Sequence, residues 1–235
     1  MTDERPSFQI RRRQSRRRRA RQTLIAVLIV LVAAGLVWLV GFSSVLGVNR
    51  VQVTGVTIVS ADQVTAAAQV VSGTPLARVN SRALAGRVTD AIPEVASVTV
   101  SRHWPNTLVI HVTERVVVYQ VLMGGTYQWV DATGTVFHSS DDPQSVPQAT
   151  LDLTDQQLVA DVATVVTALP ADLLPHVSSI TAATLDSITL SLDDDRQINW
   201  GSADQSDLKA QVIGPLLKVS GKVYNVSAPA NPSVH

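Results

Sequence analysis

The apolar residues of this chain are concentrated in one long run near its N-terminus. The run Leu24–Phe42 contains 19 residues, and the indole N–H of Trp38 is its only polar side-chain group. An α-helix of this length is about 28 Å long, close to the thickness of the hydrocarbon core of a bilayer. A core helix would have a polar face, which this run lacks, and a cleaved signal peptide has a shorter apolar core. The sequence therefore predicts an uncleaved transmembrane helix over residues 23–46.

Beyond this run, the spacing of apolar residues predicts a small α+β domain over residues 47–116. Two helices are expected there, the first capped by Ser60 and the second by Asn80. Strand-type alternation marks the segments 48–54, 97–102 and 107–113. The residues expected to face the core are Val64, Ala67, Ala68 and Val71 on the first helix, Leu84, Val88 and Ile92 on the second, and Leu108, Ile110 and Val112 on the last strand. The order β-α-α-β-β predicts both helices on one face of a three-stranded sheet.

A second, β-rich domain is predicted over residues 117–228, followed by a flexible C-terminal tail over 229–235. The segment 127–137 contains the turn Asp131–Gly134 and predicts a hairpin, whereas 138–150 is polar and predicts a loop. Further expected elements are a helix capped near Thr154, a hairpin around Asp193–Asp195, a last helix broken at Gly214-Pro215 and a terminal strand over Lys222–Ser227. The predicted fold class is α+β: an N-terminal transmembrane helix, then the β-α-α-β-β module packed beside a mostly antiparallel β domain with flanking helices.

The net charge of zero conceals a marked asymmetry along the chain. The first 22 residues contain nine arginines against two acidic residues, so this tail carries +7 and the remaining chain −7. A basic segment directly before a membrane-spanning helix is typical of a cytoplasmic N-terminus. We therefore expect residues 1–22 to form a disordered cytoplasmic tail that contacts anionic lipid headgroups, with the bulk of the chain outside the cell membrane. Nucleic-acid binding is not expected, because no aromatic residue is interleaved with the arginines.

The sequence lacks the residue patterns that catalysis and metal binding commonly require. It has no cysteine, which excludes disulfides, zinc–thiolate sites and cysteine nucleophiles. None of its five histidines is spaced i, i+4 with a histidine or carboxylate on a predicted helix, and Asp193–Asp195 does not match an EF-hand loop. Nucleophile-elbow and phosphate-binding glycine motifs are also missing. We expect no catalytic residue, metal or cofactor. The alternative, a membrane-anchored cell-envelope enzyme, would need a pocket built from Asp152, Asp155, His176 or Asp186.

A long stretch of the small α+β domain resembles a known family. Residues 92–115 (IPEVASVTVSRHWPNTLVIHVTER) combine a valine-rich strand, a turn with Arg102 and Trp104-Pro105, and a strand that ends in Glu114-Arg115. Together with the preceding segment Val48–Gly55, this pattern strongly resembles the polypeptide-transport-associated (POTRA) module of the FtsQ/DivIB family of bacterial cell-division proteins. The hairpin at 127–137, Trp200-Gly201 and the segment 223–229 resemble, more weakly, the second domain of that family.

The resemblance implies a non-enzymatic scaffold of the division machinery, concentrated at the septum. Such a protein would bind FtsB/DivIC-like and FtsL-like single-pass membrane proteins, and would help to recruit and regulate septal peptidoglycan synthesis. An envelope assembly factor is a further alternative, because POTRA modules also serve there. Such factors normally carry several POTRA copies, whereas one is predicted here.

Partner contacts are expected mainly at the end of the β domain. A terminal strand at a sheet edge leaves main-chain groups unpaired, and these can accept a strand from a partner. The resemblance also implies an FtsB-type contact at this end, although the strand could instead merely complete the core. The candidate residues are Val223, Tyr224 and Val226 on the terminal strand, with Tyr224 as the preferred anchor, Trp200 of the late hairpin and Trp104 of the POTRA loop. Asn225 stands where the family usually has aspartate, which bears on any charge-dependent role of that position.

Overall fold

The computed structural model of the chain describes residues 21–35, 37–38 and 46–235. Residues 21–35 and 37–38 are helical. Within these described ranges, no helix is both long enough and apolar enough to cross a membrane. Most of the predicted cytoplasmic tail, and residues 36 and 39–45 of the predicted transmembrane helix, lie outside the described residues. The chain divides into two compact units, one made of Met1–Ala91 and Ser97–Val112, the other of Ile92–Ala96 and Thr113–His235.

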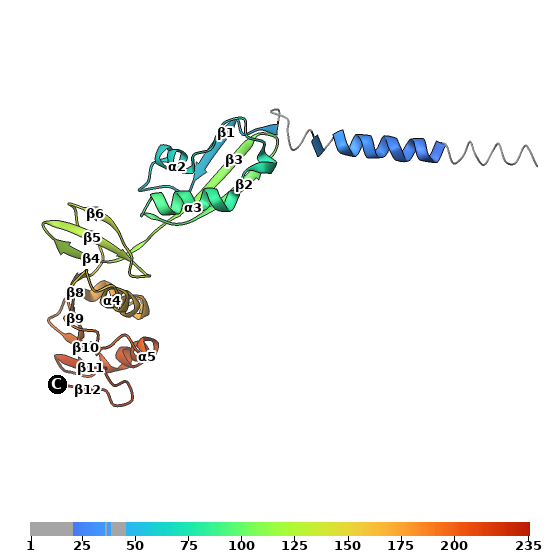
Figure 1. Cartoon of the computed structure of the whole chain (residues 1–235). Helices are drawn as coiled ribbons and strands as arrows, with labels where there is room; N and C mark the ends of the chain where they lie inside the picture. The colour runs from blue at the N-terminus through green and yellow to red at the C-terminus, as the bar shows by residue number, and fades with distance from the viewer. Residues whose placement is uncertain (1–20, 36, 39–45) are drawn as a thin grey trace, which may run out of the picture. The chain divides into compact units, whose positions relative to one another are not determined.

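After residue 46, the first unit contains a three-stranded sheet packed with the helices α2 (Ala61–Ala68) and α3 (Ser81–Ala91) (Figure 1). Its strands are β1 (Arg50–Thr54), β2 (Val95–His103) and β3 (Thr107–Glu114), in the spatial order β1-β3-β2 with β1 parallel to β3. The short 3-10 helix η2 (Leu76–Arg78) lies between α2 and α3. The chain therefore runs β1-α2-η2-α3-β2-β3 through this unit and the segment that joins it to the next.

Local sequence signals account for most of the first unit. Ser60 Oγ accepts a hydrogen bond from Gln63 N (3.2 Å), and Gln63 Oε1 accepts one from Ser60 N (2.9 Å), so both halves of a capping box start α2. Asn80 Oδ1 accepts from Ala83 N (3.1 Å) at the start of α3. The predicted core positions on β3 are buried: Leu108, Ile110 and Val112.

The prediction for Val71 was wrong. The helix α2 ends at Ala68, because Gln69 adopts a left-handed conformation with φ of 49°. Val71 therefore lies beyond the helix, and it is 72% exposed. The apolar residues from Val64 to Val71 have the i, i+3, i+4, i+7 spacing of one helical face, but the helix ends before the last of them.

The second unit is built on a nine-stranded sheet with the order β12-β11-β10-β9-β8-β7-β4-β5-β6. Figure 1 shows its helices α4 (Gln156–Ala168) and α5 (Ser206–Leu216) on the same face of this sheet. The short 3-10 helix η3 (Leu174–His176) precedes β8. The strands are β4 (Val117–Met123), β5 (Thr126–Asp131), β6 (Val136–Ser140), β7 (Gln148–Thr150), β8 (Val177–Ala182), β9 (Ile188–Leu192), β10 (Gln197–Gly201), β11 (Val223–Asn225) and β12 (Ser233–Val234).

The sheet is mostly antiparallel, with parallel pairing at three places: β4 with β7, β7 with β8, and β10 with β11. The prediction of a loop over 138–150 was wrong at both of its ends. β6 continues to Ser140, and β7 inserts between β4 and β8. The prediction of a flexible tail over 229–235 was wrong as well, because β12 pairs antiparallel with β11. Of the strands that the sequence did not predict, β7 and β12 are too short to show an alternating pattern.

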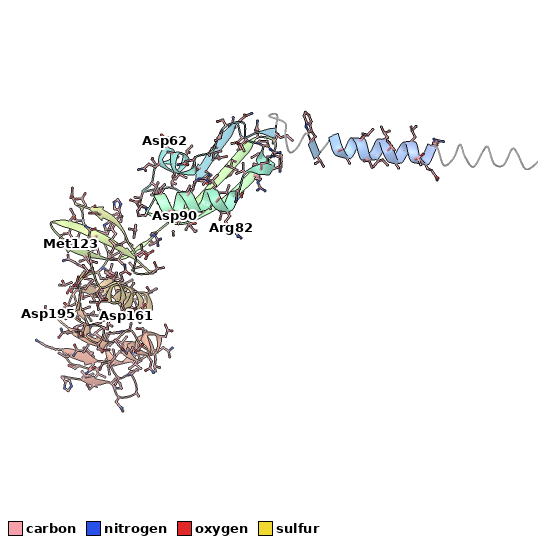
Figure 2. The ribbon with its side chains drawn as sticks, viewed as in Figure 1. Asp62, Arg82, Asp90, Met123, Asp161 and Asp195 are labelled. Atoms are coloured by element: carbon pink, nitrogen blue, oxygen red, sulfur yellow. The ribbon has the colours of Figure 1, made fainter. Side chains whose placement is uncertain are left out.

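The core of the second unit lies between the sheet and the two helices. Leu158, Val162, Val165 and Val166 of α4 are buried. Tyr119 on β4 reaches across this layer, and its hydroxyl donates a hydrogen bond to Val159 O (2.9 Å). Asp155, rather than the expected Thr154, caps α4, since its Oδ1 accepts from Gln157 N and Leu158 N (3.1 Å each). Asp161 on this helix and Asp195 in the turn before β10 are labelled in Figure 2.

Candidate partner-binding site

The strand β11 lies inside the sheet rather than at its edge. β10 pairs with it on one side, with Ile198 beside Tyr224, and β12 pairs with it on the other, with Val234 beside Tyr224. The expectation that Lys222–Ser227 forms the edge of the sheet was therefore wrong. The outer edge at this end of the sheet is β12.

Most of the candidate contact residues are part of the hydrophobic core. Trp200, Tyr224 and Val226 are at most 1% exposed, and Val223 is half-buried. The terminal strand thus completes the core, as the alternative interpretation held. Direct contact of these side chains with a partner stays a prediction. Trp104 belongs to the first unit, where it follows β2 and is 52% exposed.

Tyr224 anchors the segment that leads into β11. Its hydroxyl lies within hydrogen-bonding distance of Val219 O (2.8 Å) and Gly221 O (3.0 Å). The guanidinium of Arg196 stands over the tyrosine ring, 5.7 Å from its centroid, and donates from Nη1 to Leu217 O (3.1 Å). The side chain of Tyr224 therefore holds the connection between α5 and β11 in place.

The turn from β10 into α5 is held by buried polar groups. Trp200 Nε1 donates to Ser206 Oγ (3.1 Å), whose hydroxyl donates to Ala203 O (2.7 Å). Lys209 is buried, and its Nζ donates to Ser202 O (2.8 Å). Burial lowers the pKa of Lys209, and the acidic groups Asp204 and Asp186 act in the opposite direction. These bonds satisfy the polar atoms that the Trp200 hairpin takes into the core.

Asn225 has a local structural role that does not depend on charge. Its Oδ1 accepts hydrogen bonds from the backbone N of Ser227 (3.0 Å) and from the Ser227 hydroxyl (2.8 Å). An aspartate at this position has the same acceptor geometry, so asparagine can replace it without loss of the turn after β11.

On the edge strand β12, the main-chain N–H and C=O groups that point away from the sheet belong to Val234. Val223 N donates to His235 O (3.0 Å), and His235 N donates to Val223 O (2.9 Å), so these two residues form a hydrogen-bonded pair. Pairs alternate along an antiparallel ladder, and the N–H and C=O of Val234 consequently point away from β11. Ser233 and Val234 were not predicted as a strand, because two residues after Pro232 carry no strand signal of their own.

The four residues from which an enzymatic pocket would have to be built, Asp152, Asp155, His176 and Asp186, each interact with a different neighbour. Asp155 caps α4, while Asp152 Oδ1 accepts from Thr154 N (2.9 Å). His176 Nδ1 lies 2.9 Å from Asp193 Oδ2. The negative charge of Asp186 acts to raise the pKa of Lys209. Over the described part of the chain, no group of three or more histidine, aspartate or glutamate side chains is placed to hold a metal ion.

An ion pair at the start of the second unit joins the β3–β4 connection to the end of β5. Arg115 Nη1 pairs with Asp131 Oδ2, and Arg115 Nε donates to Pro93 O (3.0 Å). Asp131 Oδ1 accepts from Thr133 N and Thr135 N (2.9 Å each) and from the Thr133 hydroxyl (2.7 Å). Burial alone would raise the pKa of Asp131, but these hydrogen bonds and the one from Arg115 hold that pKa below its ordinary value.

Comparison with known proteins assigns both units. Residues 46–115 match the model of the "POTRA domain, FtsQ-type", and residues 120–223 match that of the "Cell division protein FtsQ/DivIB, C-terminal" domain. The extracytoplasmic domain of DivIB from Geobacillus stearothermophilus shares 16% identity with the chain at a TM-score of 0.36, covering 51% of this chain and 98% of that domain. A structural likeness of this degree adds nothing to the assignment.

Curated relatives match nearly the whole chain. The cell division protein FtsQ of Streptomyces venezuelae is 34% identical over 95% of this chain and 87% of its own length. The FtsQ protein of Mycobacteroides abscessus is likewise 34% identical, over 90% of this chain and 68% of its own length. The sequence resemblance is thereby confirmed, and the chain belongs to the FtsQ/DivIB family of cell division proteins.

Proposed function

We propose that this cell-division protein is a non-catalytic scaffold, anchored in the cell membrane, that binds FtsB/DivIC-like and FtsL-like single-pass proteins at the septum. In this role it helps to recruit and regulate septal peptidoglycan synthesis. The membership of the family supports a role in division. The observation that carries the scaffold proposal is the open edge strand β12, which lies at the end of the sheet where the family resemblance implies an FtsB-type contact.

Strand addition at β12 gives the proposed contact a physical basis. The outward N–H and C=O of Val234 can continue the ladder into a strand supplied by the partner. Val234 is half-buried and packs against the core of the second unit, so β12 is held in a defined register. The buried side chains of Tyr224, Val226 and Trp200 support this contact indirectly, because they hold β11 and β10 in position. Trp200 and Tyr224 would touch the partner only if the sheet edge rearranged.

Replacing Val234 with proline is expected to weaken binding of the partner by at least about tenfold. Proline removes the outward N–H of β12 and places its ring at the edge, whereas the bonds of His235 to β11 remain. The measurement is a titration of the full chain with the extracytoplasmic segment of its FtsB/DivIC-like partner.

The matched control is Val234→Ala, which keeps the N–H and removes most of the side chain. Both variants must show the circular dichroism of the parent chain. Equal affinity of the proline variant, the alanine variant and the parent would exclude strand addition at β12, and would direct the search to the exposed Trp104 loop.

The membrane anchor is proposed for residues 23–46, with the arginine tail at 1–22 in the cytoplasm beside anionic headgroups. Its support is the uncharged apolar run and the arginines that precede it. A reporter that is active only in the cytoplasm should be silent when it is fused after His235 and active when it is fused before Met1. The reverse pattern would show that the orientation is wrong.

A further inference from the structure

The sheet edge opposite to β12 is formed by β6. Within the described ranges, β6 pairs with β5 alone, and no strand lies beyond it. Its five residues, VFHSS, include neither lysine nor proline, which commonly protect a sheet edge against the addition of another strand. Val136, the first of them, is 39% exposed. The register of β6 with β5 shifts between His138 and Val136, so β6 bulges near its start. Beyond this bulge, the outer side of β6 is an open edge at which a further strand can pair.

A sheet face of apolar and polar side chains adjoins this edge, where Gln120 lies beside Trp129 and His138 Nδ1 lies 3.1 Å from Glu94 Oε1. The register sets Leu122 beside Tyr127 and Trp129 beside His138, so these four side chains lie on one face of β4, β5 and β6. Alternate residues of β4, such as Tyr119, point to the opposite face, which packs against α4. Leu122 is 47% exposed, as is typical of a surface that a partner covers rather than of a core.

Trp129 on this face carries an unsatisfied hydrogen-bond donor. The ring is 8% exposed, and its centroid lies 4.5 Å from that of His138. Among the side chains that the structure describes, Trp129 Nε1 is the one buried polar atom without a hydrogen-bond partner. Since a buried donor without an acceptor is destabilising, its position next to an open edge favours completion of this surface by another molecule.

The charge of the surrounding chain specifies the kind of partner. From Val116 to Asp195 the sequence contains eleven aspartates and neither lysine nor arginine. Two of these aspartates, Asp141 and Asp142, follow β6 directly and are exposed. These aspartates repel an acidic segment of a partner, whereas they attract lysine or arginine side chains.

We propose that the β6 edge binds an extended segment of a partner protein that alternates apolar residues with lysine or arginine. The segment adds a strand to β6 through main-chain hydrogen bonds. Its apolar side chains continue the face of Leu122, Tyr127 and Trp129, and its basic side chains meet Asp141 and Asp142. This surface lies at the end of the sheet order opposite to β12, so it is a second contact of the proposed scaffold and can be tested separately from the first.

The test uses the full chain in detergent micelles and two synthetic peptides of about ten residues, long enough for one strand. One peptide alternates lysine with valine, and the other alternates glutamate with valine. We expect the lysine peptide to bind, to slow amide hydrogen exchange in β6, and to bind more weakly as salt is added, because salt screens exposed charges. The glutamate peptide should leave the exchange of β6 unchanged.

Two substitutions separate the edge from the charge. Val136→Lys places a positive charge on the open strand, and Asp142→Lys reverses a charge beside it. Each should weaken binding of the lysine peptide by about tenfold or more. Asp172→Lys is the matched control, because it makes the same charge change at an exposed position outside β4, β5 and β6, and it should leave the affinity within about twofold.

Several outcomes would overturn the proposal. They are no binding of the lysine peptide, equal binding of both peptides, protection of β12 in place of β6, and equal losses in Asp142→Lys and Asp172→Lys. Protection of β6 that rises with protein concentration in the absence of peptide would also overturn it, because a second copy of the chain would then occupy the edge.

Discussion

Replacing Trp200 with alanine is expected to lower the free energy of unfolding of the second unit by about 3–5 kcal/mol. The indole is fully buried between β10 and α5, so its removal leaves a large cavity and exposes neighbouring apolar side chains. The substitution also removes the hydrogen bond that Trp200 Nε1 donates to Ser206 Oγ. Urea unfolding followed by far-ultraviolet circular dichroism measures the loss.

Two control variants separate the contributions of Trp200. Trp200→Phe keeps much of the buried volume and removes the indole N–H, and it should cost markedly less than the alanine variant. Trp104→Ala makes the same chemical change at a side chain that is half exposed, and it should shift stability only slightly. Equal losses from Trp200→Ala and Trp104→Ala would contradict the assignment of Trp200 to the core.

Replacing Asp131 with alanine is expected to destabilise the second unit by about 2–4 kcal/mol. The change leaves Arg115 without its carboxylate partner and removes the acceptor of three hydrogen bonds in the turn between β5 and β6. Asp131→Asn should cost less, because its amide oxygen can still accept from the turn N–H groups. The free energy of unfolding of the three chains at neutral pH tests this order.

The same carboxylate makes the stability of the unit depend on pH. The pKa of Asp131 is lower in the folded chain than the value near 4 expected for an unfolded one. The unfolded chain therefore binds a proton first as the pH falls, so the stabilisation is complete above about pH 4 and is lost below it, as the folded carboxylate is protonated. We expect the difference in stability between the parent and Asp131→Asn to shrink on acidification from pH 7 to pH 3. A difference that stays constant over this range would mean that Asp131 does not carry the effect.

Elements whose signals are local could be predicted from the sequence. The capping box of Ser60 and Gln63, the alternation of Leu108, Ile110 and Val112, and the turn from Asp131 to Gly134 each lie within a few consecutive residues. The chemistry of these segments decides the backbone conformation before any distant contact is made. The family also followed from the sequence, because the motif over residues 92–115 is contiguous.

The positions of the sheet edges, and hence the places where a partner can bind, depend on strand pairings that form only in the folded chain. β7 and β12 contain three and two residues, and they are strands because β4 and β8 offer main-chain partners to β7 and β11 offers them to β12. Such pairing leaves no periodic trace in so short a segment. Tyr224 was predicted as the anchor of an edge strand because its strand was expected to be the last of the sheet and β12 was not foreseen. It is buried because β10 and β12 flank its strand and the segment at 217–221 closes over its hydroxyl. Order along the chain does not determine order across a sheet, since the latter depends on which main-chain groups meet after folding.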